Sequence, residues 1–577
     1  MSRASPPLLA AALAVSLASC SGAPAPAGSS PADSARAGDP IVVVGAGVAG
    51  LSAAVEAASA GAEVVVVDRW SVFGGGAILS DGGLALVATP TQQAAGIADS
   101  AELAAADFAA RGVDVDQAWA RRYAGDSRAA VHDWLTAMGV AFTGVVPAPG
   151  NRVARLHRPR DGGLGLTAAL YRNALALGVR FHWNEDVTEL TVDEGRVVGV
   201  RMRGVRDGRA RERRAAAVIL ATGGFTGDVE RVQSSWPGDL PVPERILAGS
   251  GAGSLGVGLD LARQAGGALR RMDHVALDPA GVPDPRVRGG DRGLRVDLPR
   301  SIWVNRDGRR FVDESGGPAV TLAAALHQPG AAYWAILDAD GARAITVEGP
   351  AWRDPRRVAA QILDSPLVAR GDSLAALARA ADLPGAALEG AVATHNLGSA
   401  GFDLARPPFY AIRLYPLARG SLGGVAVDDA GRVLRGDGDP VDGLYAAGEV
   451  TGFAGIGGRD AVDGALLGAS VMMGRSAGRA ATAQVGARRP ARAVGPVPVP
   501  VPAAGFPDAD CTSCHPPEAL ALDRPGWQHV AASHGDTRAG RQPCAACHAE
   551  LYPYRNDAHR IDPMIASDSC RRCHLPR

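Results

Sequence analysis

The sequence contains no lysine: all 59 of its basic side chains are arginines, and 60 side chains are acidic. Without lysine, the protein cannot form a Schiff base through a lysine amine. The balance of basic and acidic residues leaves a net charge of −1, so the arginines do not indicate a nucleic-acid-binding surface. The abundance of arginine, alanine and glycine is typical of a GC-rich coding sequence. A chain of 577 residues is long enough for two or three domains with hydrophobic cores.

The sequence also has no N-terminal apolar run long enough to cross a bilayer. The run at residues 8–18 follows Arg3 and has the length of the hydrophobic region of a signal peptide. It ends at Leu17-Ala18-Ser19-Cys20, which resembles the lipobox of bacterial lipoproteins. We therefore expect residues 1–19 to be a lipoprotein signal peptide and Cys20 to be lipidated in the periplasm, at the outer rather than the inner membrane. The alternative is an ordinary secretory signal with an incidental cysteine. In either case residues 20–39, rich in Pro, Ala, Gly and Ser, predict a flexible tether.

The stretch 41–68 has the pattern of a strand, a helix and a second strand. Gly45-x-Gly47-x-x-Gly50 lies between the first strand and the helix, and Asp68 ends the second strand. Gly45 permits the tight turn, Gly47 lets the backbone approach a pyrophosphate, and Gly50 packs the helix against the strand. Asp68 can accept hydrogen bonds from a ribose hydroxyl. The pattern therefore predicts a dinucleotide-binding βαβ unit, the alternative being a glycine-rich turn without a ligand.

The rest of the chain to residue 485 predicts one α/β domain interrupted by a second domain. Glycine-dense turns at 74–76 and 80–83 suit a backbone that lies close to a flat, extended ligand. The fold class is α/β, with a Rossmann-like domain at 40–280 and 401–485 and an inserted α+β cap domain at 281–400. The expected helices are 99–140 (with His132 as an ordinary helix residue), 164–178, 322–326, 374–380, 385–397 and 464–485. The expected strands are 41–44, 64–67, 179–183, 196–203, 209–216, 218–224, 333–337, 409–415 and 443–449, the last running into a glycine turn.

Six motifs in order resemble the flavoprotein family of fumarate reductases, succinate dehydrogenases and 3-ketosteroid dehydrogenases. They are GAGVAG (45–50), GGGAILSDGG (74–83), ATGGF (221–225), GAGSLGVGLDLARQAGGAL (251–269), VNRDGRRFVDE (304–314) and GLYAAGEVTG (443–452). The resemblance covers about residues 40–485 and implies non-covalently bound FAD beneath the cap domain. NAD is the alternative, but the later glycine turns suit a long flavin dinucleotide better.

The resemblance and the glycine motif together give a set of expected cofactor contacts. These residues are Gly45, Gly47, Ala49, Gly50, Asp68, Arg69, Gly75, Gly76, Ala77, Gly82, Gly83, Val187, Gly223, Glu449, Gly464, Ala465 and Leu466.

The catalytic pattern of fumarate reductases is mostly absent. Asp278 stands where that family has a histidine before proline, Pro318 lies near the position of the proton-donating arginine, and Gly420 takes the place of the second histidine. The last arginine corresponds to Arg459, or its position to Asp460 if the alignment moves by one residue. These losses argue against fumarate as the substrate. The candidate acids are Asp278, Arg300, Tyr410, Arg419 and Arg459, each with a salt-bridge or core role as the alternative.

After a proline-rich linker at 486–509, residues 510–577 contain three C-x-x-C-H motifs. This is the attachment signature of c-type haem, in which two thioethers hold the porphyrin and the histidine is the proximal ligand. Disulfides or zinc are alternatives, but neither requires a histidine after every second cysteine. The motif residues are Cys511, Cys514, His515, Cys544, Cys547, His548, Cys570, Cys573 and His574, and the expected distal ligands are His529, His534 and His559, with Met564 as a competing ligand.

These features together predict an exported flavocytochrome c with FAD and three c-type haems in a small tail with little regular secondary structure. In this interpretation the haems pass electrons to FAD, which reduces the C=C bond of an α,β-unsaturated carbonyl compound. The expected partners are a periplasmic cytochrome or a quinol-linked membrane cytochrome, a small-molecule substrate and, through the lipid anchor, the membrane. One alternative is a dehydrogenase that passes electrons outward through the haems. Another is an electron-transfer lipoprotein without substrate chemistry.

Overall fold

The computed structural model describes residues 38–498, with gaps at 71–72, 206, 252, 286–289, 350–351, 353, 399–400 and 461. The predicted signal peptide with Cys20, nearly all of the tether, and the predicted haem ligands between 511 and 574 lie outside the described residues. No helix in the described part of the chain is long and apolar enough to cross a membrane.

The centre of the first sheet consists of three short, mainly apolar strands, Ile41–Val44, Val64–Asp68 and Ala217–Leu220, whose residues are all buried. Its strands are β1 (Ile41–Val44), β2 (Val64–Asp68), β6 (Arg180–Trp183), β10 (Ala217–Leu220), β21 (Arg432–Leu434) and β22 (Pro440–Ala446). Their order is β21-β22-β10-β1-β2-β6, and all neighbours pair in parallel except β21 with β22. Continuous apolar runs of this kind are typical of parallel strands covered on both faces. The predicted βαβ unit at 41–68 is confirmed.

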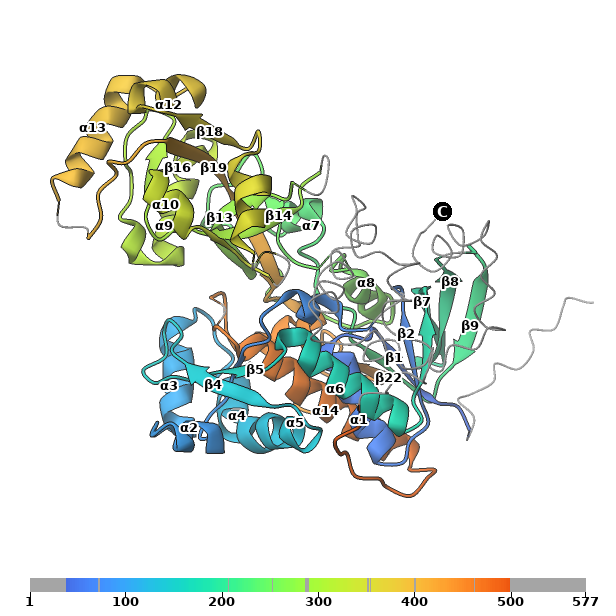
Figure 1. The fold of residues 1–577 in the computed structure, drawn as a ribbon. Coiled ribbons are helices and arrows are strands. Elements are labelled where there is room, and N and C mark those ends of the chain that lie inside the picture. The colour runs from blue at the N-terminus through green and yellow to red at the C-terminus, as the bar shows by residue number, and fades with distance from the viewer. Residues whose placement is uncertain are drawn as a thin grey trace, which may run out of the picture. The chain divides into compact units, whose positions relative to one another are not determined.

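Three helices, α1 (Val48–Ser59), α6 (Gly162–Ala176) and α14 (Ala465–Val485), lie side by side next to this sheet (Figure 1). Small residues let α14 pack closely on α1. A Cβ atom at Gly474 would collide with the Ala49 carbonyl oxygen, and one at Gly478 with that of Ala53. These glycines lower the intrinsic helix propensity of α14, but they allow it to lie against the cofactor-motif helix.

A helical layer follows where helical periodicity predicts one at 99–140. It consists of α2 (Pro90–Ala94), α3 (Ala101–Arg111), α4 (Gln117–Ser127), a π-helical turn (Arg128–Asp133) and α5 (Trp134–Ala137), next to a small sheet of β3 (Leu84–Ala85), β5 (Leu156–Pro159) and β4 (Phe142–Val146). His132 lies within this helical segment, as predicted, and its place there is the π-helical turn. His132 is buried in the π-helical turn, its Nε2 lies 3.0 Å from Thr91 Oγ1, and its Nδ1 lies 2.8 Å from Asp133 Oδ1.

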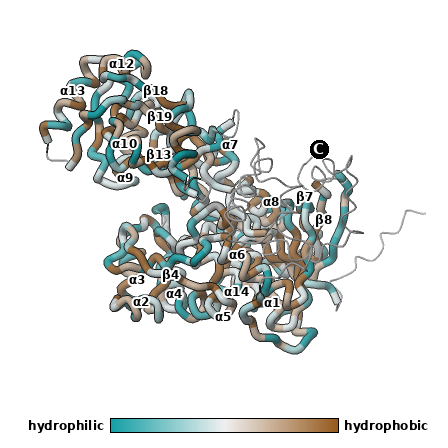
Figure 2. Tube along the Cα trace, in the orientation of Figure 1, coloured by the Kyte–Doolittle hydropathy of each residue, from teal (hydrophilic) through white to brown (hydrophobic). Residues whose placement is uncertain are grey.

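The predicted hairpin is confirmed as β8 (Arg196–Gly204) and β9 (Ala210–Arg214), and a third strand, β7 (Glu185–Asp193), pairs with β8. Strand β7 was not predicted, because register shifts interrupt the alternation of buried and exposed side chains along it. Figure 2 shows hydrophilic residues along the outer side of this sheet, beside β8. Shorter elements follow in the chain: α7 (Val229–Ser234), β11 (Leu247–Ala248), α8 (Val257–Gln264), β12 (Leu269–Arg270) and, later, β20 (Gly424–Val425).

The second large sheet carries the cap. Its strands are β13 (Val275–Pro283), β14 (Gly293–Asp297), β15 (Ile302–Asn305), β16 (Tyr333–Leu337), β17 (Thr346–Val347), β18 (Val368–Gly371) and β19 (Phe409–Ser421), and its helices are α9 (Pro318–Leu326), α10 (Ala339–Ala344), α11 (Pro355–Val358), α12 (Leu374–Ala380) and α13 (Gly385–Asn396). The long strand β19 pairs with β16, β13, β18 and β11. It runs six residues beyond the predicted end at Tyr415 and reaches the first domain at Ser421.

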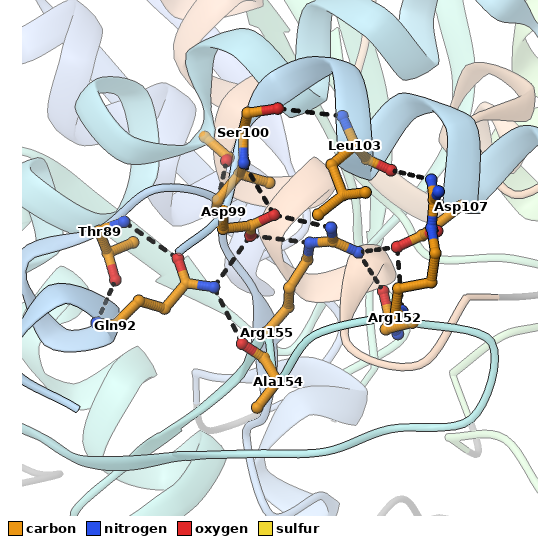
Figure 3. Close-up of polar contacts among 12 residues, drawn as sticks. Thr89, Gln92, Asp99, Ser100, Leu103, Asp107, Arg152, Ala154 and Arg155 are labelled. Carbon is orange, nitrogen blue, oxygen red and sulfur yellow. Dashed lines mark hydrogen bonds and ion pairs between the residues drawn. The ribbon is translucent and has the colours of Figure 1, made fainter. Parts of the chain in front are cut away.

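A buried ion-pair network joins the helical layer to β5 (Figure 3). Arg155 is fully buried, and its Nε and Nη2 donate to the two carboxylate oxygens of Asp99 at 2.8 and 2.7 Å. Its Nη1 donates to Asp107 and to Asn151. Gln92 donates to both Asp99 and the Ala154 carbonyl oxygen. The network thereby fixes the start of β5.

We expect Arg155→Met to destabilise the protein by about 3–5 kcal/mol, because it leaves the buried carboxylate of Asp99 without its cation and removes the buried cation of Asp107. Arg152→Met is the matched control. Arg152 also donates to Asp107, but its side chain is 58% exposed, so its loss should cost about 1 kcal/mol or less. Urea unfolding followed by tryptophan fluorescence measures both, and equal losses for the two variants would contradict a special role of Arg155.

Candidate functional site

The described residues enclose a cleft of about 740 Å³ where the first sheet and the cap sheet meet. The ends of β1 and β2, the segment after β10 and the turn after β22 form one wall. Residues of β14 and β19 form another wall, together with the segment after β17. The carboxyl ends of parallel strands are the usual ligand-binding edge of such sheets.

Most of the residues expected to contact the cofactor line this cleft. They are Gly45, Gly47, Ala49, Asp68, Arg69, Gly75, Gly76, Ala77, Gly82, Gly83, Val187, Gly223, Glu449, Gly464 and Leu466. Gly50 and Ala465 are buried and do not line it. Residues from both ends of the first domain are thus brought together, although they are more than 400 positions apart in the chain.

The glycines of the motif at 45–50 have two different roles. Gly45 has a φ of +107°, and a Cβ atom there would collide with the Ala221 carbonyl oxygen. A Cβ atom at Gly50 would collide with the Gly45 carbonyl oxygen. At Gly47 and Gly76, by contrast, an added Cβ atom would meet nothing within 4 Å. The first two glycines are therefore required by the fold, whereas Gly47 and Gly76 leave space on the cleft wall for a ligand.

Asp68 is held at the end of β2 by two backbone groups. The N–H of Ala46 donates to Asp68 Oδ2 and the N–H of Trp70 donates to Oδ1, each at 2.7 Å. Burial raises the pKa of Asp68 to about 6, although these hydrogen bonds act in the opposite direction. A hydroxyl that donates to this carboxylate would stabilise its charged form.

Further polar groups on the cleft wall can serve a ligand. The hydroxyls of Thr222 and Ser250 are buried and make no hydrogen bond within the described part of the chain. Glu449 accepts a hydrogen bond from the N–H of Ser421 at 3.0 Å, and burial raises its pKa. Buried polar groups without partners are costly, so these hydroxyls fit a wall that a polar ligand completes.

Charged residues line the cap side of the cleft. Arg295 donates from Nε to Asp278 Oδ2 at 2.7 Å, and Arg419 Nη1 lies 3.9 Å from the same oxygen. Arg419 Nη2 also donates to both carboxylate oxygens of Glu348 at 2.7 Å. Arg295, Arg419 and Glu348 line the cleft, whereas Asp278 is buried directly behind them. Asp278 and Arg419 were predicted as candidate acids. Arg295 and Glu348 were not predicted, because no local motif marks them.

The other three candidate acids are not brought to the cleft. Arg459 donates to Asp239 at 2.6 Å and is not among the lining residues. Arg300 packs over the ring of Phe402, with 5.2 Å between Cζ and the ring centroid. Tyr410 belongs to the core of the cap sheet. Within the described residues, these three side chains therefore have structural roles: an ion pair for Arg459, packing on an aromatic ring for Arg300 and a core position for Tyr410.

Gly420 lines the cleft beside Glu449, and Pro318 is the first residue of α9. Neither can supply an imidazole or a guanidinium. Within the described residues, no group of three or more His, Cys, Asp or Glu side chains is arranged to hold a metal ion.

Comparisons with known proteins agree with this geometry. A family model described as the FAD binding domain matches residues 40–465. A fumarate reductase (cytochrome) from Shewanella frigidimarina is 33% identical over 461 residues, covering 76% of this chain and 76% of that protein. A KsdD-like steroid dehydrogenase from Mycobacterium tuberculosis is 30% identical over 545 residues, covering 77% and 96%. The solved open conformation of a flavocytochrome c3 fumarate reductase matches with a TM-score of 0.66 at 28% identity, covering 78% of each chain.

The open space at Gly47 predicts a variant that folds but does not bind FAD. Gly47 has an extended backbone, with φ −77° and ψ −176°, so Gly47→Val should fit the protein without cofactor and then occupy space that FAD needs. Gly144→Val is the control, since a Cβ atom there also meets nothing within 4 Å and Gly144 does not line the cleft.

We expect purified Gly47→Val to contain less than about a tenth of the FAD of the wild type, because a clash that costs only 1.4 kcal/mol already weakens binding tenfold. Flavin absorbance per chain measures this. A full FAD content in Gly47→Val, or equal losses in the two variants, would show that the cofactor does not approach Gly47.

Proposed function

The chain belongs to the FAD binding domain family and is an FAD-dependent oxidoreductase that acts on carbon–carbon bonds, and we propose that it is an exported flavocytochrome c. Its reaction in this proposal is the reduction of the C=C bond of an α,β-unsaturated carbonyl compound. When bound, FAD supplies hydride transfer to or from carbon. The observation that carries the choice of substrate is the cap wall of the cleft, where each of Arg295 and Arg419 already faces a carboxylate.

The chain's own residues explain how the site would work. The glycines of the motif, with Gly76, leave space for the cofactor, and Asp68 offers an acceptor to its ribose. Arg419 and Arg295 can donate hydrogen bonds to a carbonyl oxygen in the cleft, which stabilises negative charge that develops there during reduction. Fumarate fits this site poorly, because two carboxylates require cations that are not already compensated.

The linker after α14 supports electron exchange with the tail. The N–H groups of Arg488 and Arg489 donate to the Gly61 carbonyl oxygen, and the N–H of Arg492 donates to that of Ser59. The N–H of Gly495 donates to Asn173 Oδ1 at 3.2 Å. The described part of the linker is therefore attached to the FAD-binding domain as far as Gly495, which supports a position of the proposed haems within reach of that domain.

The proposal includes export and a membrane anchor. The signal-like segment and Cys20 support a periplasmic protein lipidated at that cysteine, with the outer membrane preferred. A periplasmic cytochrome or a quinol-linked membrane cytochrome would exchange electrons with the haems. The reverse direction, in which substrate oxidation sends electrons out through the haems, uses the same site and differs only in the redox potentials.

We expect three covalent haems per chain, because each of the three C-x-x-C-H motifs supplies two cysteines and one proximal histidine. Intact-mass spectrometry of protein from a host that matures c-type cytochromes measures the number of adducts. Replacing both cysteines of one motif by serine should remove one adduct, and fewer than three adducts on the wild type would contradict the proposal. Replacing His529, His534 or His559 by alanine should convert one haem each from low to high spin.

We expect the reduced protein to be reoxidised anaerobically by uncharged enones and to show negligible turnover with fumarate. Loss of a positioned proton donor typically lowers a rate by about 10²–10⁴ with either class of compound, but only fumarate also requires cations that are not already compensated. A panel of enones and enoates, followed by flavin and haem absorbance, tests this. Fumarate turnover in the range of ordinary enzymes, about 1–10³ per second, would contradict the substrate assignment. No reoxidation by any compound would favour the electron-transfer interpretation.

A further inference from the structure

The cap wall of the cleft carries four charged side chains that form one continuous network. Asp278 lies on β13, Arg295 on β14, Arg419 on β19, and Glu348 follows β17. The closest N···O distances are 2.7 Å for Arg295–Asp278, 3.9 Å for Arg419–Asp278 and 2.7 Å for Arg419–Glu348. The strands fix this arrangement: Asp278 is paired with Leu417 on β19, two residues before Arg419, and Gly281 on the same strand is paired with Arg295.

These four residues carry two positive and two negative charges. Burial lowers the pKa of Arg295, but the charge and hydrogen bond of Asp278 and the charges of Glu348 and Asp297 together raise it above its usual value, so Arg295 remains a cation. Arg292 also lines this wall, and its guanidinium donates to the Ser250 carbonyl oxygen. Along the whole lining of the cleft, acidic residues outnumber arginines. The cleft therefore has arginine donors without a surplus of positive charge.

An anion and a neutral carbonyl respond differently to such a wall. A guanidinium has five N–H donors, and the contacts of Arg419 with Glu348 use only Nη2. The remaining N–H groups can donate to a neutral carbonyl oxygen at no electrostatic cost. A carboxylate in the same place would meet Glu348, a like charge whose side chain is 36% exposed, and would repel it.

We propose that Glu348 and Asp278 are specificity-determining residues, which compensate Arg419 and Arg295 so that the cleft accepts an uncharged α,β-unsaturated carbonyl compound and rejects a carboxylate of the same shape. This inference rests on the proposed function, because the same cleft has to hold the substrate. It adds that the selectivity depends on the compensating carboxylates, and that removing one of them should open the site to anions.

The test compares two probes of one skeleton, benzylideneacetone (a methyl ketone) and trans-cinnamate (the carboxylate). The proteins are the wild type with FAD, Glu348→Gln and the double variant Glu348→Gln/Arg419→Gln. Glu189→Gln is the matched control, since Glu189 forms an exposed ion pair with Arg201 outside the cleft. Binding is measured by the perturbation of the flavin absorbance of the oxidised protein, and turnover separately with a reduced dye.

We expect Glu348→Gln to bind cinnamate about tenfold more tightly than the wild type, the effect of removing one like charge a few ångströms from the ligand. Its affinity for benzylideneacetone should change by less than about twofold. Glu189→Gln should match the wild type with both probes. The double variant should lose the gain, because the unmasked cation is then also absent.

An unchanged ratio of the two affinities in Glu348→Gln would overturn the inference. So would a gain that survives in the double variant, or the absence of binding by both probes to the wild type and to Glu348→Gln. The binding and turnover measurements distinguish failure of the charge compensation from failure of the proposed function. A gain in cinnamate binding without turnover of either probe would contradict the proposed function and support the charge compensation. Turnover of the ketone with an unchanged affinity ratio would support the proposed function and overturn the charge compensation.

Discussion

The close approach of three backbone segments at the carboxyl edge of the first sheet is the constraint on which the rest of the structure depends. The turn at Gly45 lies against the Ala221 carbonyl oxygen, and the first turn of α1 lies against Gly45 through Gly50. Only residues without a Cβ atom fit at these two points. Because β1, β2, β10 and β22 all end at this edge, the same contact that packs the sheet also forms one wall of the cleft.

Local sequence patterns predicted the helices and strands that have a continuous apolar run or a regular helical period. The buried strands β1, β2 and β16 and helix α12 were predicted to within one residue, since an apolar run or a helical period determines each of them. Asp278 and Arg419 could be identified by position, but their partners could not. Arg295 is brought to them by the pairing of β13 with β14 and β19, and Glu348 by the pairing of β14 with β17. No local motif in the sequence marks these long-range pairings. The fully buried Arg155 was missed for the same reason, while Arg459, whose position followed from a motif, lies outside the cleft.

Strand β19 connects the cap wall of the cleft with the wall formed by the first domain. Its residues Leu417 and Arg419 lie on the cap wall, and two positions further Ser421 donates its N–H to Glu449 beside the cofactor cradle. Strand β19 has a partner along its whole length, with β18 and β16 at its start and with β13 from Tyr415 to Ser421. The Arg419 guanidinium and the Glu449 carboxylate on the two walls of the cleft are therefore connected through one chain segment. That arrangement suits a reaction in which substrate and cofactor must be held in contact.

The path of the linker constrains how electrons from the tail could reach the cleft. The linker is bonded to Ser59 and Gly61 at the C-terminal end of α1, whereas the cleft lies at the N-terminal end of that helix, at Gly47. A helix of 12 residues separates the two ends by about 18 Å. Residues 499–510 can extend by at most about 40 Å before the first haem motif, which is enough to pass this distance.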